Sequence, residues 1–135
     1  MNRSFPATMD ELHEMLKFVR GEFNVEGFKG AVLTQMELAV EEAIVNIIKH
    51  GYIKKCGDIR IDCIHLIEKP GIKVILVDCG IHYNPLLNIP KDLNVSMDAR
   101  PIGGYGVHLI KKIMDKVDYE YKDECNVLTL TKYRS

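Results

Sequence analysis

The stretch "DIRIDCIHLIEKPGIKVILVD", residues 58–78, decides the fold class. Its first part alternates between apolar and polar side chains, which is the period of a strand with one buried face. Its last part, residues 72–78, is almost continuously apolar, as in a strand at the centre of a sheet. Between them, "KPG" at 69–71 consists of turn-forming residues. The stretch therefore predicts a β-hairpin.

Helical periodicity dominates the part of the chain before this hairpin. Apolar residues recur at spacings of three and four over residues 9–20 and again over residues 28–50. The first predicted helix is expected to end near Gly21 and the second at Gly51, because glycine is common just after the last turn of a helix.

The part after the hairpin begins with a long connection, residues 79–103, which exceeds ordinary loop lengths and is expected to be a lid, a binding loop or a disordered segment. A helix is predicted over 106–117 and strands over 118–122 and 126–133, separated by a turn at 123–124. The resulting order predicts an α+β domain. We expect a two-layer sandwich in which helices cover one face of a mostly antiparallel or mixed sheet.

Length and composition indicate a globular protein with a single domain over residues 1–135. Hydrophobic residues make up 47% of the chain and charged residues 27%, and the net charge of -1 gives no reason to expect direct binding to nucleic acid or to an anionic membrane. The start of the chain has no apolar stretch of the signal-peptide type, and no segment is long and apolar enough to span a bilayer. A cytoplasmic location is therefore expected.

The four cysteines, Cys56, Cys63, Cys79 and Cys125, are widely spaced and form no CxxC pair. This pattern favours free thiols in a reducing compartment over a disulfide framework or a zinc site.

A row of polar residues interrupts the second predicted helix, within "EEAIVNIIKHGY" at 41–52. Glu42 and Asn46 fall on the border of its apolar arc, and His50 falls closer to the middle. A lone polar residue at such a border is more often solvated or bound to a neighbouring loop. Glu42 and Asn46 together favour a catalytic or metal-binding site, since a carboxylate can polarise an attacking hydroxyl and an Asn oxygen can bind Mg²⁺. His50 is expected to be a hydrogen-bonded structural residue.

A second motif, "VILVDCGIHYNP" at 74–85, places Asp78 at the end of the apolar strand. A carboxylate there can accept a hydrogen bond from an exocyclic amine such as that of adenine, and Gly80 lets a ligand approach the backbone. The alternative is ordinary turn chemistry at a strand end.

A third motif, "RPIGGYGVHLI" at 100–110, places Gly103, Gly104 and Gly106 before a helix. Free backbone N–H groups and the helix dipole would favour a phosphate there, although a hinge at a helix start would need the same residues. The motif is not a Walker A loop, because no Gly-Lys-Ser/Thr follows, and it opens no βαβ unit of the Rossmann type.

These three motifs, in this order and spacing, resemble the GHKL (Bergerat-fold) ATP-binding domains. The likeness extends from about Thr8 to Tyr133 and is greatest to the anti-sigma-factor serine/threonine kinases, whose catalytic unit is a histidine-kinase-like ATPase domain. Tyr83 stands where the family usually has Phe, and Asn84 where it often has Asp. Both changes are compatible with the family pattern.

The resemblance implies a role for each matching residue. Glu42 would be the general base on the acceptor hydroxyl, Asn46 would hold Mg²⁺, and Asp78 would read the adenine amino group. The remaining matches are assigned to nucleotide contacts: Gly80 beside the adenine, Gly103, Gly104 and Gly106 around the phosphates, Arg100 at the γ-phosphate, and Thr129 on the adenine side.

The function implied by the resemblance is an ATP- and Mg²⁺-dependent protein serine/threonine kinase. Such a protein phosphorylates a small STAS-domain antagonist and sequesters a sigma factor, and it is often a homodimer. The alternative is a regulatory module that binds nucleotide but transfers nothing. Retention of Glu42 favours the kinase, because nucleotide binding alone would need only Asp78 and Asn46. A third alternative is an α+β domain that binds no ligand. It would require that all three motifs have only a structural role.

Overall fold

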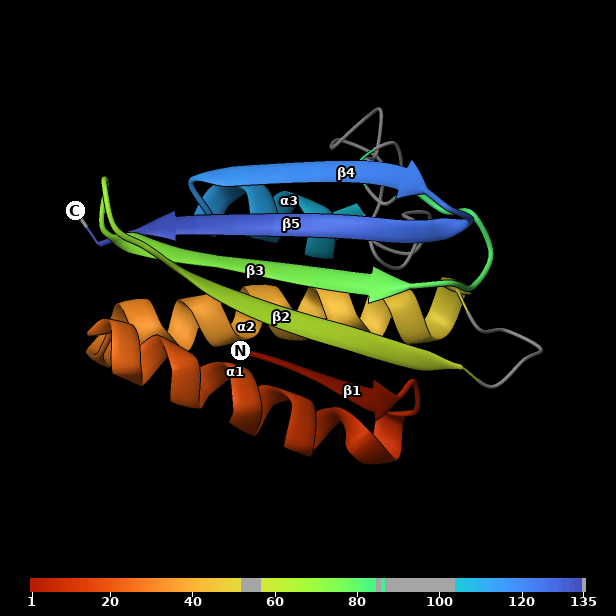
Figure 1. Ribbon diagram of the computed structural model, residues 1–135, viewed down its shortest axis with the longest axis horizontal. Helices are drawn as coiled ribbons and strands as arrows, with labels where there is room; N and C mark the ends of the chain where they lie inside the picture. Colours follow the sequence, from red (N-terminus) through yellow and green to blue (C-terminus); the bar gives the residue numbers. More distant parts are fainter. Residues whose placement is uncertain (52–56, 85, 87–103, 135) are drawn as a thin grey trace.

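The computed structural model describes residues 1–51, 57–84, 86 and 104–134 of the chain. A five-stranded, fully antiparallel sheet in the order β1-β2-β3-β5-β4 carries three helices against one face (Figure 1). This confirms the predicted α+β fold class. The elements are β1 Asn2–Pro6, α1 Leu12–Glu26, α2 Gly30–Asn46, β2 Asp58–Leu66, β3 Gly71–Asp78, α3 Gly104–Ile113, β4 Lys116–Lys122 and β5 Cys125–Tyr133.

The predicted hairpin is confirmed as β2 and β3, which pair antiparallel with Ile61 opposite Leu76. Gly71 begins β3 at a point where two strands approach closely. A Cβ on this residue would lie 2.4 Å from the carbonyl oxygen of Lys132 on β5. Glycine is therefore required there by the close contact between β3 and β5.

The core lies between the helices and one face of the sheet. Alternate residues of β2 and β3 point to this face, so the period of two in the sequence becomes one buried layer. The largest fully buried side chains come from both helices α1 and α2 and from strands β2, β3 and β5: Met15, Val19, Phe23, Met36, Val40, Ile44, Ile59, Ile61, Ile72, Val74, Leu76 and Leu130. Each such side chain contributes roughly 1.5–3 kcal/mol through removal from water.

Helix α1 extends further than the sequence predicted. It continues through Gly21 to Glu26 and ends at Gly27, whose φ of 109° is left-handed. Phe23 is fully buried and shares a face with Val19, so packing of this extra turn outweighs the helix penalty of Gly21, which is about 1 kcal/mol.

Strand β1 was not predicted from the sequence. It pairs antiparallel with β2, and its Phe5 is buried against the core. Its short run ending in Pro6 carries little periodicity of its own, and its partner strand begins only at Asp58. The pairing therefore depends on tertiary contacts rather than on a local signal.

The C-terminal elements follow the predicted order with shifted bounds. Helix α3 ends at Ile113, earlier than expected, and Val117 belongs to β4, where it pairs with Leu130. The turn at Asp123 and Glu124 is confirmed, and both residues have positive φ, as a two-residue hairpin turn requires. Most of the predicted connection 79–103 lies outside the described residues.

The expectation that all cysteines are free thiols is wrong for one pair. Cys79 and Cys125 form a disulfide. The paired positions Asp78 and Asn126 end the β3–β5 ladder; Cys79 directly follows Asp78, and Cys125 directly precedes Asn126. Cys63 is a free, buried thiol, and its burial, with the nearby Glu22 carboxylate, raises its pKa to about 12. The pairing of β3 with β5 brings Cys79 and Cys125 together, and the spacing of cysteines in the sequence does not show this pairing.

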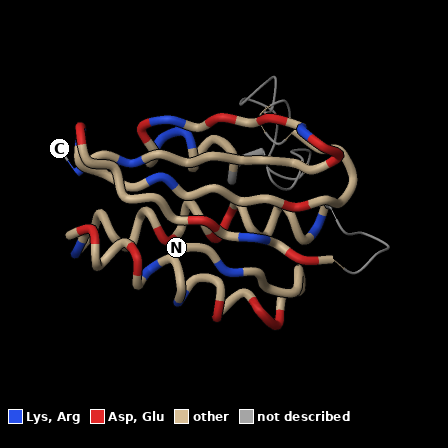
Figure 2. Tube along the Cα trace, in the orientation of Figure 1, with Lys and Arg blue, Asp and Glu red and all other residues tan. Residues whose placement is uncertain are grey.

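Charges of both signs are interspersed along the described helices and strands (Figure 2). None of the helices combines the length and the apolar character that crossing a membrane would require, among the residues that the structure describes.

Candidate functional site

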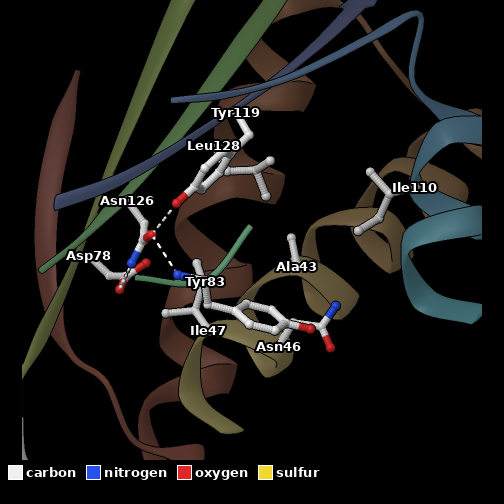
Figure 3. A pocket seen from close by; sticks show the side chains of 9 residues that line it. All are labelled: Ala43, Asn46, Ile47, Asp78, Tyr83, Ile110, Tyr119, Asn126 and Leu128. Carbon is white, nitrogen blue, oxygen red and sulfur yellow. Dashed lines mark hydrogen bonds between the residues drawn. The ribbon is translucent and has the colours of Figure 1, made fainter. Parts of the chain in front are cut away.

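A pocket lies between α2, α3 and the sheet, near the ends of β3 and β5 (Figure 3). It brings together residues from segments that are far apart in the sequence. Its lining consists of Ala43, Asn46, Ile47, Asp78, Tyr83, Ile110, Tyr119, Asn126 and Leu128. Apolar walls with a few converging polar groups are typical of sites for small organic ligands.

Asn46 is placed in this pocket by the last turn of α2. Its side chain is buried, and its Nδ2 has no hydrogen-bond partner among the described residues. A π-helical turn, Ile47–Gly51, begins immediately after it. Such turns are frequent at functional sites, and a buried amide without a partner is costly unless a ligand completes it.

Asp78 is the last residue of β3 and is 3% exposed. Its Oδ1 accepts hydrogen bonds from the Gly80 N–H and from Asn126 Nδ2, both at 3.1 Å. Burial raises the pKa of Asp78 above its ordinary value, and these two hydrogen bonds act in the opposite direction. Gly80, predicted to leave room for a ligand, thus also holds the carboxylate in a local turn.

Asn126 is a central residue of the site that the sequence reasoning missed. It lies on β5 directly opposite Asp78, and besides that carboxylate it binds Ile81 O through Nδ2 at 2.9 Å. Its Oδ1 accepts from the Tyr83 N–H at 3.1 Å and from the Tyr119 hydroxyl. The available signal was its position on the same face of the strand as Leu128 and Leu130, where an apolar residue is expected.

Tyr83 occupies the space between the two predicted ligand-binding groups. In Figure 3 its ring lies between the Asp78 carboxylate and the Asn46 carboxamide. The cavity is about 20 Å³, which is room for about one water molecule. The Tyr83 ring thus takes up part of the space between Asp78 and Asn46.

His50 stacks on the Tyr83 ring, with centroids 4.7 Å apart and planes at 15°. The expected structural hydrogen bond is not found at its Nε2, which has no partner within the described residues. The imidazole of His50 is therefore packed by ring stacking on Tyr83.

Tyr119 covers the pocket from β4. Burial raises the pKa of its phenol, and the neighbouring charges of Asp78 and Tyr121 act in the same direction. The phenol therefore stays protonated, which suits its role as a donor to Asn126.

Glu42 lies one turn before Asn46 on α2, so both side chains project from the same side of the helix. It is half-buried but is not among the residues lining the pocket. No hydrogen bond or ion pair holds its carboxylate within the described part of the chain. The structure thus brings Asn46 and Asp78 into one pocket and leaves Glu42 beside it.

The remaining predicted residues have different positions. Gly104 and Gly106 lie in the first turn of α3, the helix that supplies Ile110 to the pocket. Thr129 does not reach the pocket, because it alternates with Leu128 along β5 and therefore points to the opposite face of the sheet. Arg100 and Gly103 lie outside the described residues.

Comparison with known proteins identifies relatives of the chain. The family model described as "Histidine kinase-like ATPase domain" matches residues 5–132. The serine-protein kinase RsbW of Bacillus mycoides (strain KBAB4) is 29% identical over 117 residues, and the match covers 84% of this chain and 71% of that protein. RsbW of Bacillus cereus (strain ATCC 10987 / NRS 248) is 28% identical over 118 residues with the same coverage. These matches confirm the resemblance found in the sequence motifs.

Proposed function

Because the chain belongs to the family of histidine kinase-like ATPase domains, we propose that it binds ATP with Mg²⁺ and is a protein serine/threonine kinase. Its proposed substrate is a small STAS-domain antagonist protein, and its proposed second partner is a sigma factor that it sequesters in the cytoplasm. The relatives named serine-protein kinase support the transfer to a protein hydroxyl.

One observation carries this proposal. Asn46 and Asp78, predicted from two separate motifs to bind magnesium and adenine, line the same pocket, and Nδ2 of the buried Asn46 has no described partner. A protein that used neither group would have no reason to retain two buried polar side chains facing one cavity.

Adenine recognition is assigned to Asp78. Because Oδ1 is occupied by two donors, Oδ2 is the oxygen left for an exocyclic amino group. Apolar side chains such as Leu128 and Ile110 line the same space and would contact a purine ring.

The Mg²⁺ site is assigned to Asn46. No described hydrogen bond fixes its carboxamide, so a half-turn of the amide presents its oxygen to a cation without breaking a contact. This fits Mg²⁺, which takes a few protein oxygens and completes its shell with phosphates and water. When bound, the ion would neutralise charge on the phosphates during transfer.

Phosphoryl transfer is assigned to Glu42 as general base. It would accept the proton of a Ser or Thr hydroxyl as that oxygen bonds to the γ-phosphorus and the bond from this phosphorus to the β,γ-bridging oxygen breaks, releasing ADP. Its position one turn from Asn46 supports this role, because the acceptor must meet the γ-phosphate close to the metal.

A nucleotide-binding regulatory module without transfer is the second candidate. The position of Glu42 outside the pocket lining favours it, since a base must come within hydrogen-bond reach of the acceptor oxygen.

Labelled ATP separates the two candidates. The purified protein is incubated with γ-labelled ATP, Mg²⁺ and STAS-domain proteins, and we expect label on a Ser or Thr of one of them. Glu42→Gln should keep ATP binding and lose transfer, whereas the control Glu41→Gln, which changes the neighbouring half-buried carboxylate, should retain both. Transfer by Glu42→Gln at the normal rate would remove Glu42 from the chemistry. ATP binding without any transfer would support the regulatory module.

A further inference from the structure

We propose that Asn126 is a specificity-determining residue, which orients Asp78 so that the site accepts a 6-aminopurine and rejects a 6-ketopurine. The inference rests on the proposed binding of nucleotide at Asp78. It concerns a residue on a different strand, 48 positions further along the chain.

The orientation of the Asn126 amide is determined by its surroundings. Nδ2 faces the Ile81 carbonyl oxygen at 2.9 Å, which can only accept, and Oδ1 faces the Tyr83 N–H at 3.1 Å, which can only donate. Rotating the amide by a half-turn would therefore place like groups against each other at both contacts. Both N–H bonds and both oxygen lone pairs of Asn126 are used, since Asp78 and Tyr119 take the other two.

This fixed amide in turn determines which oxygen of Asp78 faces a ligand. Oδ1 receives the second N–H of Asn126 and the backbone N–H of Gly80, both at 3.1 Å. Oδ1 is therefore an acceptor and carries no proton. No other described residue donates to the carboxylate, so Oδ2 is the oxygen available to a base.

When Asp78 is ionised, its Oδ2 is an acceptor, and it then distinguishes two purines that differ at C6. A 6-amino group donates a hydrogen bond to it, whereas a 6-keto oxygen would meet it as a second acceptor. A site built around such a buried acceptor discriminates strongly against a partner that cannot donate.

Loss of Asn126 would weaken this selectivity in two ways. Asp78 would lose one of its two donors and could rotate. Burial already raises the pKa of Asp78, and the bond from Asn126 opposes that effect, so removing it would favour a proton on Oδ2. A protonated Oδ2 can donate to a keto oxygen.

The test compares the dissociation constants of ADP and inosine 5′-diphosphate, which differ only in the purine ring. The wild-type protein should bind ADP more tightly. In Asn126→Leu, which keeps the branched shape of the side chain but cannot hydrogen-bond, the preference for ADP should fall roughly tenfold or more. Val127→Ala is the matched control, because it changes the same strand on the opposite face and should leave the preference unchanged.

A second variant, Asn126→Asp, covers the case that Asn126→Leu does not fold. It can still accept from Tyr83 and Tyr119, but it replaces the donor facing Asp78 with an oxygen, so the preference should also fall. Equal loss of both nucleotides in a folded variant, or a preference within about twofold of wild type, would overturn the inference. Failure of the wild-type protein to bind either nucleotide would instead overturn the proposed function.

Discussion

Asp78 and Asn126 face each other at the end of the β3–β5 ladder, and a hydrogen bond of 3.1 Å joins their side chains within the buried part of the pocket. Cys79, which follows Asp78, and Cys125, which precedes Asn126, are joined by a disulfide. The end of the β3–β5 ladder is thus held by two adjacent links, the Asp78–Asn126 hydrogen bond and the Cys79–Cys125 disulfide. Both constrain the segment that carries Gly80 and Tyr83 past the pocket.

Replacing Asp78 by asparagine should change how stability depends on pH. Because the folded-state pKa of Asp78 is raised above 3.8, the folded protein holds the proton more strongly than the unfolded chain. The stability contributed by Asp78 is fully present below the unfolded pKa and is lost as pH rises through the folded pKa. The free energy of unfolding of Asp78→Asn should therefore rise relative to wild type as the pH increases from 3.8 through the raised folded-state pKa. Urea titrations of both proteins measure this difference, and a flat or falling difference would contradict the prediction.

Nucleotide binding should be lost in the same variant. The oxygen of the new carboxamide would take the place of Oδ1 between its two donors, so an amide N–H would face the amino group of adenine. The thermal shift given by Mg-ATP should therefore disappear although the fold is retained. Asp118→Asn, on exposed β4, is the control and should keep the shift. A normal shift in Asp78→Asn would exclude Asp78 from base recognition.

Asn46→Leu should stabilise the free protein while removing its Mg²⁺-dependent binding. The variant replaces a buried amide whose Nδ2 has no described partner with an apolar side chain of the same branching and number of heavy atoms. We expect a gain of about 1 kcal/mol in the free energy of unfolding. Asn24→Leu, on the exposed side of α1, serves as the control. A loss of stability in Asn46→Leu would show that the amide is already satisfied in the free protein.

Breaking the Cys79–Cys125 disulfide should destabilise the fold. The bond closes a loop of 46 residues, and loop-closure entropy predicts a loss of about 4 kcal/mol on its removal. The comparison is between wild type and Cys79→Ser/Cys125→Ser in denaturant, with mass spectrometry after alkylation to establish the oxidised state of wild type. Identical midpoints for the oxidised wild type and the double variant would contradict the prediction.

Two glycines should respond to alanine in opposite directions. At Gly71 a Cβ would lie 2.4 Å from the Lys132 carbonyl oxygen, so Gly71→Ala should cost about 1–3 kcal/mol. At Gly21, inside α1, no atom outside the backbone of its own helix and its chain neighbours lies within 4 Å of the added Cβ among the described residues. Gly21→Ala should therefore gain about 0.5–1 kcal/mol from helix propensity. Thermal denaturation of both variants measures the contrast, and the same sign at both sites would refute it.

Local patterns predicted the helices and four of the five strands, because periodicity and turn residues act over a few neighbouring positions. They did not predict β1, whose pairing with β2 is non-local, or the continuation of α1 past Gly21, where burial of Phe23 outweighs local propensity. The disulfide was missed for the same reason as β1, since it depends on which distant strands become neighbours.

For the candidate site, the sequence by itself singled out two polar side chains with the capacity to bind a ligand: Asn46 on an apolar helix and Asp78 at the end of an apolar strand. Only the tertiary structure decided which side chains lie next to these two residues. The antiparallel pairing of β3 with β5 places Asn126 against Asp78, and strand alternation turns Thr129 to the other face. The chemistry that a side chain can perform follows from its residue type, which the sequence gives. The orientation of the Asp78 carboxylate depends on two donors, and only the folded sheet brings both of them within 3.1 Å.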